Sequence, residues 1–90
     1  MVSNANRKPS NEALRARELL IAHLCKMIRA RNLTQAQAGQ WLGLSQPRVS
    51  DLLRRRLDKF NVDSLIRILA VAGVRLSIEL VDTKRGSNLD

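Results

Sequence analysis

The sequence has few of the residues on which several classes of protein depend. Aromatic residues make up 2% of its 90 residues, with Trp41, Phe60 and no tyrosine. The aromatic platforms on which single-stranded nucleic acids stack are therefore missing. The single cysteine, Cys25, excludes an internal disulfide, and we expect a reducing, cytoplasmic setting.

Residues suited to catalysis or to membrane insertion are also scarce. His23 is the only histidine and no carboxylate cluster accompanies it, so we expect no enzyme, metal site or cofactor. His23 and Cys25 are two positions apart on a predicted helix and cannot form a dyad, so we expect both to be packing residues. The longest mostly apolar run, residues 68–74, is far shorter than the ~20 residues that span a bilayer, and residues 1–10 lack the apolar region of a signal peptide. We therefore expect a soluble protein with no membrane partner.

Positive charge is what the sequence has in excess. Sixteen lysines and arginines and eight acidic residues give a net charge of +8. This charge favours a polyanionic partner, and the lack of aromatics makes duplex DNA the leading candidate. Between positions 29 and 59, seven basic residues accompany two acidic ones, so more than half of the net charge lies there.

Apolar periodicity predicts a mainly helical fold with four or five helices. We expect helices over residues 12–31, 35–42, 46–54 and 62–72. Thr34, Ser45 and Asn61 are the predicted N-caps of the last three, and Gly43 and Gly73 stand where helices end. Residues 11–73 are therefore predicted to form the one compact domain.

The residues after this domain change their period. Apolar side chains alternate with more polar ones over residues 74–81, which predicts one strand with one apolar face, made of Val74, Leu76, Ile78 and Leu80. A single strand cannot satisfy its own backbone, so we expect it to pair with its copy across a twofold dimer. A partner protein that completes the sheet is the alternative. Residues 1–10 and 82–90 are polar and are expected to form a flexible arm and a flexible tail.

Residues 34–53 have the pattern of two short helices joined by a three-residue turn. That arrangement needs apolar inward positions, a tiny residue at the closest approach and glycine in the turn. The residues that match are Ala38, Gly39, Leu42, Gly43, Leu44, Val49 and Leu52. The pattern predicts a helix-turn-helix, with an ordinary helical hairpin as the alternative.

The run LTQAQAGQWLGLSQPRVSDLL, residues 33–53, resembles the phage-repressor and Cro-like (XRE) helix-turn-helix proteins. More narrowly, residues 45–50, 57–60 and 63–65 resemble HigA-like antitoxins and related single-domain regulators. The resemblance covers about residues 15–80. This chain has Arg55 where such proteins often have a glycine after the recognition helix.

The resemblance implies that the helix 46–54 enters the major groove with its first residues against the base edges. Gln46 has the chemistry to pair with adenine and Arg48 with guanine, while Gln35 is placed on a phosphate. The predicted DNA contacts are Gln35, Ser45, Gln46, Pro47, Arg48, Ser50, Arg54, Arg55, Arg56 and Lys59. Alternatively, residues 54–56 form a merely solvated turn and Gln46 is a surface residue. For Trp41 we expect packing at the core edge, with a protein-partner contact as the alternative.

Together these inferences predict a sequence-specific repressor that binds a palindromic operator as a homodimer. The resemblance also implies the antitoxin of a type II toxin–antitoxin pair, which regulates its own operon and blocks a small toxin protein. A stand-alone prophage-type repressor is the alternative to that role. A non-specific nucleoid or RNA-binding module is a third hypothesis.

Overall fold

A computed structural model describes residues 11–82 of the protein. In this range it contains α1 (Asn11–Ala30), α2 (Gln35–Leu42), α3 (Gln46–Leu53), the short 3₁₀ helix η2 (Leu57–Lys59) and α4 (Val62–Val71). The mainly helical fold is confirmed, and the helices end within one or two residues of the predicted positions. The predicted arm, residues 1–10, and all of the predicted tail except Asp82 lie outside the described residues.

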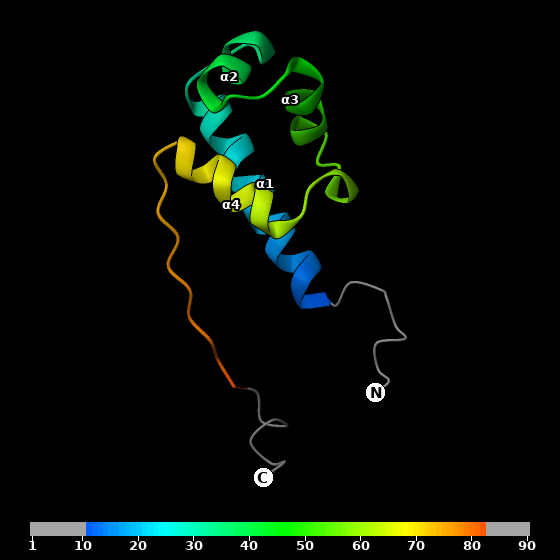
Figure 1. The fold of residues 1–90 in the computed structure, drawn as a ribbon, viewed down its shortest axis with the longest axis vertical. Coiled ribbons are helices and arrows are strands. Elements are labelled where there is room, and N and C mark those ends of the chain that lie inside the picture. The colour runs from blue at the N-terminus through cyan, green and yellow to red at the C-terminus, as the bar shows by residue number, and fades with distance from the viewer. Residues whose placement is uncertain (1–10, 83–90) are drawn as a thin grey trace.

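The long helix α1 is the element against which α3, η2 and α4 pack, and α2 packs against α3 and α4. Helices α2 and α3 sit together at one end of α1, and α4 crosses it (Figure 1). One apolar side of each helix faces this centre and supplies the core, and no polar or charged residue in the described range is buried. Removing these side chains from water is the main stabilising contribution. The core consists of Ile21, Leu24, Cys25, Ile28, Ala38, Leu42, Val49, Leu52, Phe60, Leu65, Ile68 and Leu69.

The predicted N-caps are confirmed and fix where α2, α3 and α4 begin. Thr34 Oγ1 accepts a hydrogen bond from the Gln37 amide at 3.1 Å, and Gln37 Oε1 accepts one from the Thr34 amide at 2.9 Å, forming a capping box. Ser45 Oγ accepts from the amide of Arg48 at 3.3 Å, and Asn61 Oδ1 from that of Ser64 at 2.8 Å. Each cap satisfies an amide that has no partner within its helix.

The turn between α2 and α3 brings the two helices into close approach. Gly43 adopts the left-handed conformation with φ 72°, and its amide donates to the Gly39 carbonyl. A β-carbon on Gly39 would lie 2.5 Å from the carbonyl oxygen of Leu44, closer than real Cβ contacts. The predicted requirement for a tiny residue at position 39 is therefore confirmed.

The predicted strand, residues 74–81, has no partner within residues 11–82. Gly73, with φ 86°, closes α4, and the Val74 amide donates to the Leu69 carbonyl at 2.9 Å. Residues 75–82 then run away from the helices as an extended segment (Figure 1) and make no hydrogen bond in the described part of the chain. Pairing by this segment remains a prediction.

The described helices include none that is both long and apolar enough to cross a membrane.

Replacing Gly39 should disrupt the joint between α2 and α3. We expect Gly39→Ala to lower the free energy of unfolding by about 1–3 kcal/mol, because the backbone carbonyl of Leu44 has to move to admit the new methyl group. Urea denaturation measures the change. Gln40→Ala, exposed on the same helix, is the control and should stay within about 0.5 kcal/mol of the parent. A Gly39→Ala protein as stable as the parent would contradict the close approach.

Candidate nucleic-acid interface

One side of α3 faces the core and the opposite side faces solvent. Val49 and Leu52 are fully buried. With about 100° between successive residues of a helix, the direction opposite to this pair passes through Pro47, Ser50, Asp51 and Arg54, with Gln46 at its margin. We call these five residues the outer face of α3. It presents amide, hydroxyl, carboxylate and guanidinium groups on a single exposed helix.

The start of α2 lies beside the start of α3. Gln35 is the exposed first residue of α2, as predicted. A shallow hollow between the two helices is lined by Ala36, Gln37, Gly39, Gln40, Leu44 and Gln46. The outer face therefore continues into a polar rim on α2.

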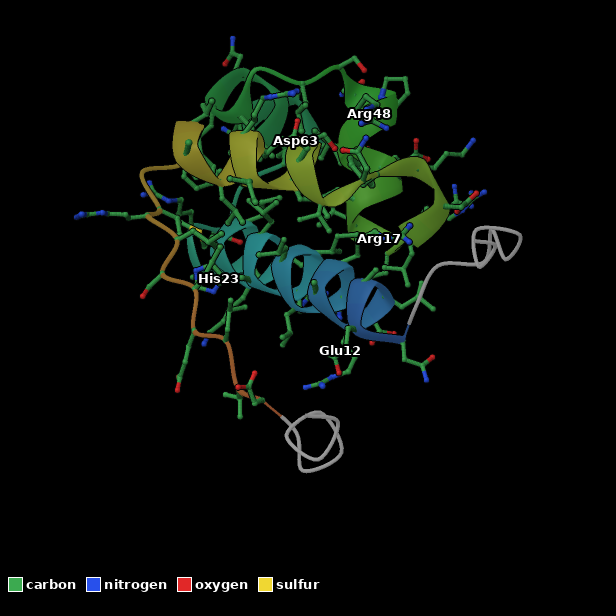
Figure 2. The ribbon with its side chains drawn as sticks, turned by 60° about the horizontal axis from the view of Figure 1, so that its bottom comes forward. Glu12, Arg17, His23, Arg48 and Asp63 are labelled. Atoms are coloured by element: carbon green, nitrogen blue, oxygen red, sulfur yellow. The ribbon has the colours of Figure 1, made fainter. Side chains whose placement is uncertain are left out.

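Arg48, predicted to read a base, makes two contacts within the protein instead. Its Nη1 donates to the carbonyl oxygen of Lys59 at 2.9 Å, and its guanidinium carbon lies 4.1 Å from the centre of the Phe60 ring. Phe60 is buried in the core, directly before the cap of α4. Figure 2 shows Arg48 on the same side of the molecule as Asp63, in the first turn of α4. The guanidinium thus ties α3 to the η2–α4 connection and lies off the outer face.

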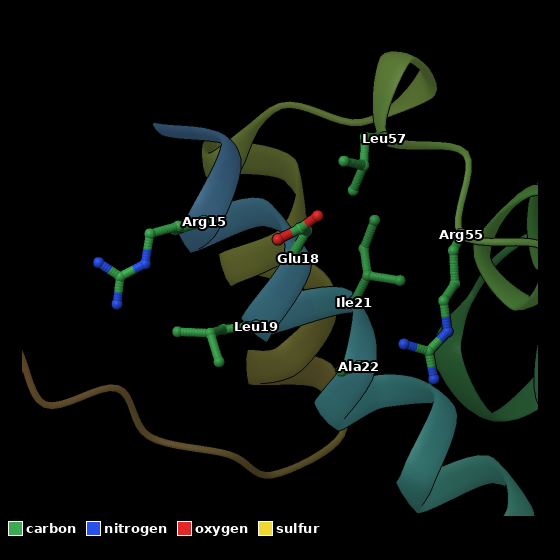
Figure 3. Close-up of a pocket in the computed structure, with 7 residues that line it drawn as sticks. All are labelled: Arg15, Glu18, Leu19, Ile21, Ala22, Arg55 and Leu57. Atoms are coloured by element: carbon green, nitrogen blue, oxygen red, sulfur yellow. The ribbon is translucent and has the colours of Figure 1, made fainter. Parts of the chain in front are cut away.

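The arginines after α3 diverge. Arg54 is exposed and belongs to the outer face, whereas Arg56 is half-buried and its Nε lies 3.8 Å from Oδ1 of Asp58. Arg55 has φ 54°, the left-handed conformation that a glycine adopts easily and an arginine rarely. Its side chain lies beside α1, lining a hollow with Ile21 and other residues (Figure 3). The turn therefore has a glycine-like shape despite the arginine.

Some predicted contacts are brought together and others are not. Gln46, Pro47, Ser50 and Arg54 share the outer face of α3. Gln35, at the start of α2, and Lys59, at the end of η2, are exposed. The hydroxyl of Ser45 is engaged as a helix cap, while Arg48 and Arg55 turn toward the protein. Asp51 also lies on the outer face but was not among the predicted contacts. Its position four residues after Pro47 is the signal that could have revealed it, because residues i and i+4 share a helix face.

Cys25 and His23 are the two side chains of the types most often associated with catalysis. Cys25 is buried and His23 is exposed. Cys25 is fully buried and its Sγ donates to the Leu52 carbonyl at 3.3 Å. Burial raises the pKa of this thiol, with Arg55 and Arg29 acting in the opposite direction. His23 is exposed, so the prediction that it packs in the core was wrong; it lies opposite the buried side of α1. Residues 11–82 contain no group of three or more potential metal ligands from His, Cys, Asp and Glu.

Trp41 lies at the edge of the core near the end of α1. It is half-buried against the core, as the packing interpretation predicts. The guanidinium of Arg31 lies over its ring, 4.2 Å from the centre. This contact connects the end of α1 to α2.

Comparison with known proteins agrees with this geometry. The sequence profile of a family described as a helix-turn-helix domain matches residues 5–80, which include α1, α2, α3, η2 and α4. A search of curated proteins finds no match to the chain. The narrower resemblance to HigA-like antitoxins is not confirmed by this match.

The contacts of Arg48 should contribute to stability. We expect Arg48→Ala to lower the free energy of unfolding by about 1–2 kcal/mol, because a charge-assisted hydrogen bond and a cation–π contact are lost. Arg48→Lys keeps the charge but lacks the planar guanidinium group, and should recover only part of the lost free energy of unfolding. The control is Arg54→Ala, because the side chain of Arg54 makes no hydrogen bond or ion pair within residues 11–82. Equal stability of Arg48→Ala and the parent in urea denaturation would show that these contacts contribute nothing.

Proposed function

The chain belongs to the helix-turn-helix domain family, and from this premise we propose that it is a sequence-specific repressor that binds duplex DNA. The observation that carries the proposal is the outer face of α3, which presents polar side chains on a helix opposite Val49 and Leu52. An α-helix fits the major groove, where each base pair has its own pattern of donors and acceptors. The protein's net charge of +8 supplies attraction to the phosphates.

Base readout is assigned to the outer face itself. Gln46 has the donor and acceptor to pair with adenine, Ser50 serves either kind of partner, and the Asp51 carboxylate accepts a hydrogen bond from cytosine N4. Arg48 receives a different role from the one expected from sequence, because its guanidinium is held by Lys59 and Phe60. We assign Arg48 to positioning α3.

Phosphate contacts are assigned to residues around the outer face. Arg54, Lys59 and Gln35 are exposed, and Arg56 is half-buried. Such contacts set the orientation of the protein on the duplex without reading its sequence. Arg55 lies further toward α1 and is the weakest member of the predicted set.

Helix-turn-helix repressors commonly bind as dimers to two half-sites of one operator. We propose a twofold homodimer formed by residues 74–81, through Val74, Leu76, Ile78 and Leu80. It would present two copies of α3 to half-sites about 34 Å apart, one turn of DNA. A footprint of the purified protein on its own promoter tests this, since two symmetric half-sites are expected.

The antitoxin role is the finer version of the proposal, and it rests on the sequence resemblance alone. It requires a gene for a small toxin next to this one. Co-expression of that neighbour with this chain should relieve its growth arrest, whereas a stand-alone repressor leaves the arrest unchanged.

Replacing Gln46 should alter base preference. We expect Gln46→Ala to weaken operator binding by about 1–3 kcal/mol and to relax preference at one base pair in each half-site. Titration of labelled operator and random duplex measures both effects. Gln40→Ala, on the neighbouring rim of α2, is the matched control and should keep the preference unchanged. Equal weakening of operator and random binding by Gln46→Ala would remove Gln46 from base readout, and no preference in the parent would favour the non-specific module.

Salt should weaken binding strongly. With six to ten phosphate contacts per dimer, affinity is expected to fall by about 10³–10⁵ between 50 and 200 mM salt. Arg54→Ala should reduce the slope of log affinity against log salt by about two per dimer and leave base preference unchanged. Lys26→Ala removes the same charge from the exposed side of α1 and should leave the slope unchanged. A parent slope near zero is incompatible with the proposed phosphate contacts.

A further inference from the structure

The C-terminal segment, residues 74–81, is the most exposed apolar feature that the DNA interface does not use. Ile78 is 73% exposed, Leu80 is 88% exposed and Leu76 is 37% exposed. Val74, in contrast, packs against the core and anchors the segment. Residues 75–82 also make no backbone hydrogen bond within the described part of the chain. An extended, unpaired apolar edge of this kind pairs readily with another strand.

We infer that two copies of this segment pair antiparallel in one register, centred on Ser77. The inference rests on the proposed homodimer and deepens it by stating which residues meet. The occupant of the apolar edge is thus a second copy of this chain. The order of charged and apolar residues along the segment supports this register.

In an antiparallel pair centred on Ser77, residues on the two strands are opposite when they lie equally far from the centre. Arg75 then faces the partner's Glu79, and by symmetry Glu79 faces the partner's Arg75. Leu76 faces the partner's Ile78, and Val74 faces the partner's Leu80. Over residues 74–80, every charged residue meets its opposite charge and every apolar residue meets an apolar one. Such directly opposite pairs are the units that stabilise a sheet.

Neighbouring registers lose this complementarity. Centring the pair on Leu76 places Glu79 opposite Gly73 and Arg75 opposite Ser77 of the partner. Centring it on Ile78 places Arg75 opposite Val81. In registers whose twofold axis passes between two residues, most apolar side chains lie opposite polar ones, because successive side chains of a strand point to opposite faces. The charges therefore select the register, while the apolar face supplies most of the binding.

Cysteine cross-linking tests the register in the full chain. Ser77→Cys places two thiols directly opposite each other, at a Cα separation within the range that a disulfide spans. We expect nearly complete disulfide-linked dimer under mild oxidation. Arg75→Cys, tested at a concentration at which it is still dimeric by light scattering, is the matched control, because its two copies would be four residues apart along the strands, about 13 Å. The natural Cys25 is buried and does not interfere.

Charge reversal provides a second test that uses no cysteine. Arg75→Glu alone, or Glu79→Arg alone, sets two like-charged pairs in each homodimer, and we expect each to raise the dissociation constant roughly ten- to a hundred-fold. An equimolar mixture of the two variants restores opposite charges across both pairs. The mixture should therefore form heterodimers with near-parental affinity, measured by light scattering and sedimentation at low salt.

The outcomes separate the register from the wider proposal. If the parent dimerises but the Arg75→Cys and Ser77→Cys variants cross-link equally well, the register is wrong. The register is also wrong if the mixture of charge-reversed variants binds no more tightly than either variant alone. A parent that stays monomeric at high concentration overturns the homodimer as well. Specific DNA binding is read separately, from the footprint, and its absence would reject the proposed function while leaving the cross-linking result intact.

Discussion

The close approach of α2 and α3 at Gly39 is the constraint on which the rest of the site depends. With no side chain at this position, the backbone of Leu44 passes where a β-carbon would lie. This contact, together with the left-handed Gly43, sets the angle between the two helices. The angle in turn buries Val49 and Leu52 in the core and leaves the outer face of α3 toward solvent. A core arrangement thus decides which side chains are available to a partner.

Arginines serve different purposes around this helix although they share the same charge. Arg48 stacks on Phe60 and donates to the Lys59 carbonyl, so it joins α3 to the loop before α4. Arg55 adopts a backbone conformation with φ 54°, which costs an L-residue about 1–2 kcal/mol. Arg54, between them, is free of such roles and faces solvent. The number of arginines in this part of the sequence therefore overstates how many are free to contact a partner.

The two proposed interfaces are linked through α4. Its capped start lies next to Phe60, on which Arg48 rests, and its end at Gly73 leads into the segment proposed to pair with a second copy. One short helix therefore connects the loop that holds Arg48 to the segment proposed to form the dimer contact. This arrangement would hold two copies of α3 at a fixed separation with little intervening flexible chain.

The sequence by itself determined the helices, their caps and the helix-turn-helix, because these depend on local periodicity and on side chains that bond amides three residues away. It also determined the alternating pattern of residues 74–81, although one chain offers that pattern no partner. Only the tertiary structure decided that His23 is exposed, that Asp51 joins the outer face and that Arg48 leaves it. The position of Arg48 depends on the Lys59 carbonyl and the Phe60 ring, eleven and twelve residues further along the chain. No local pattern encodes such a contact, since it exists only once α3 and α4 have packed on α1.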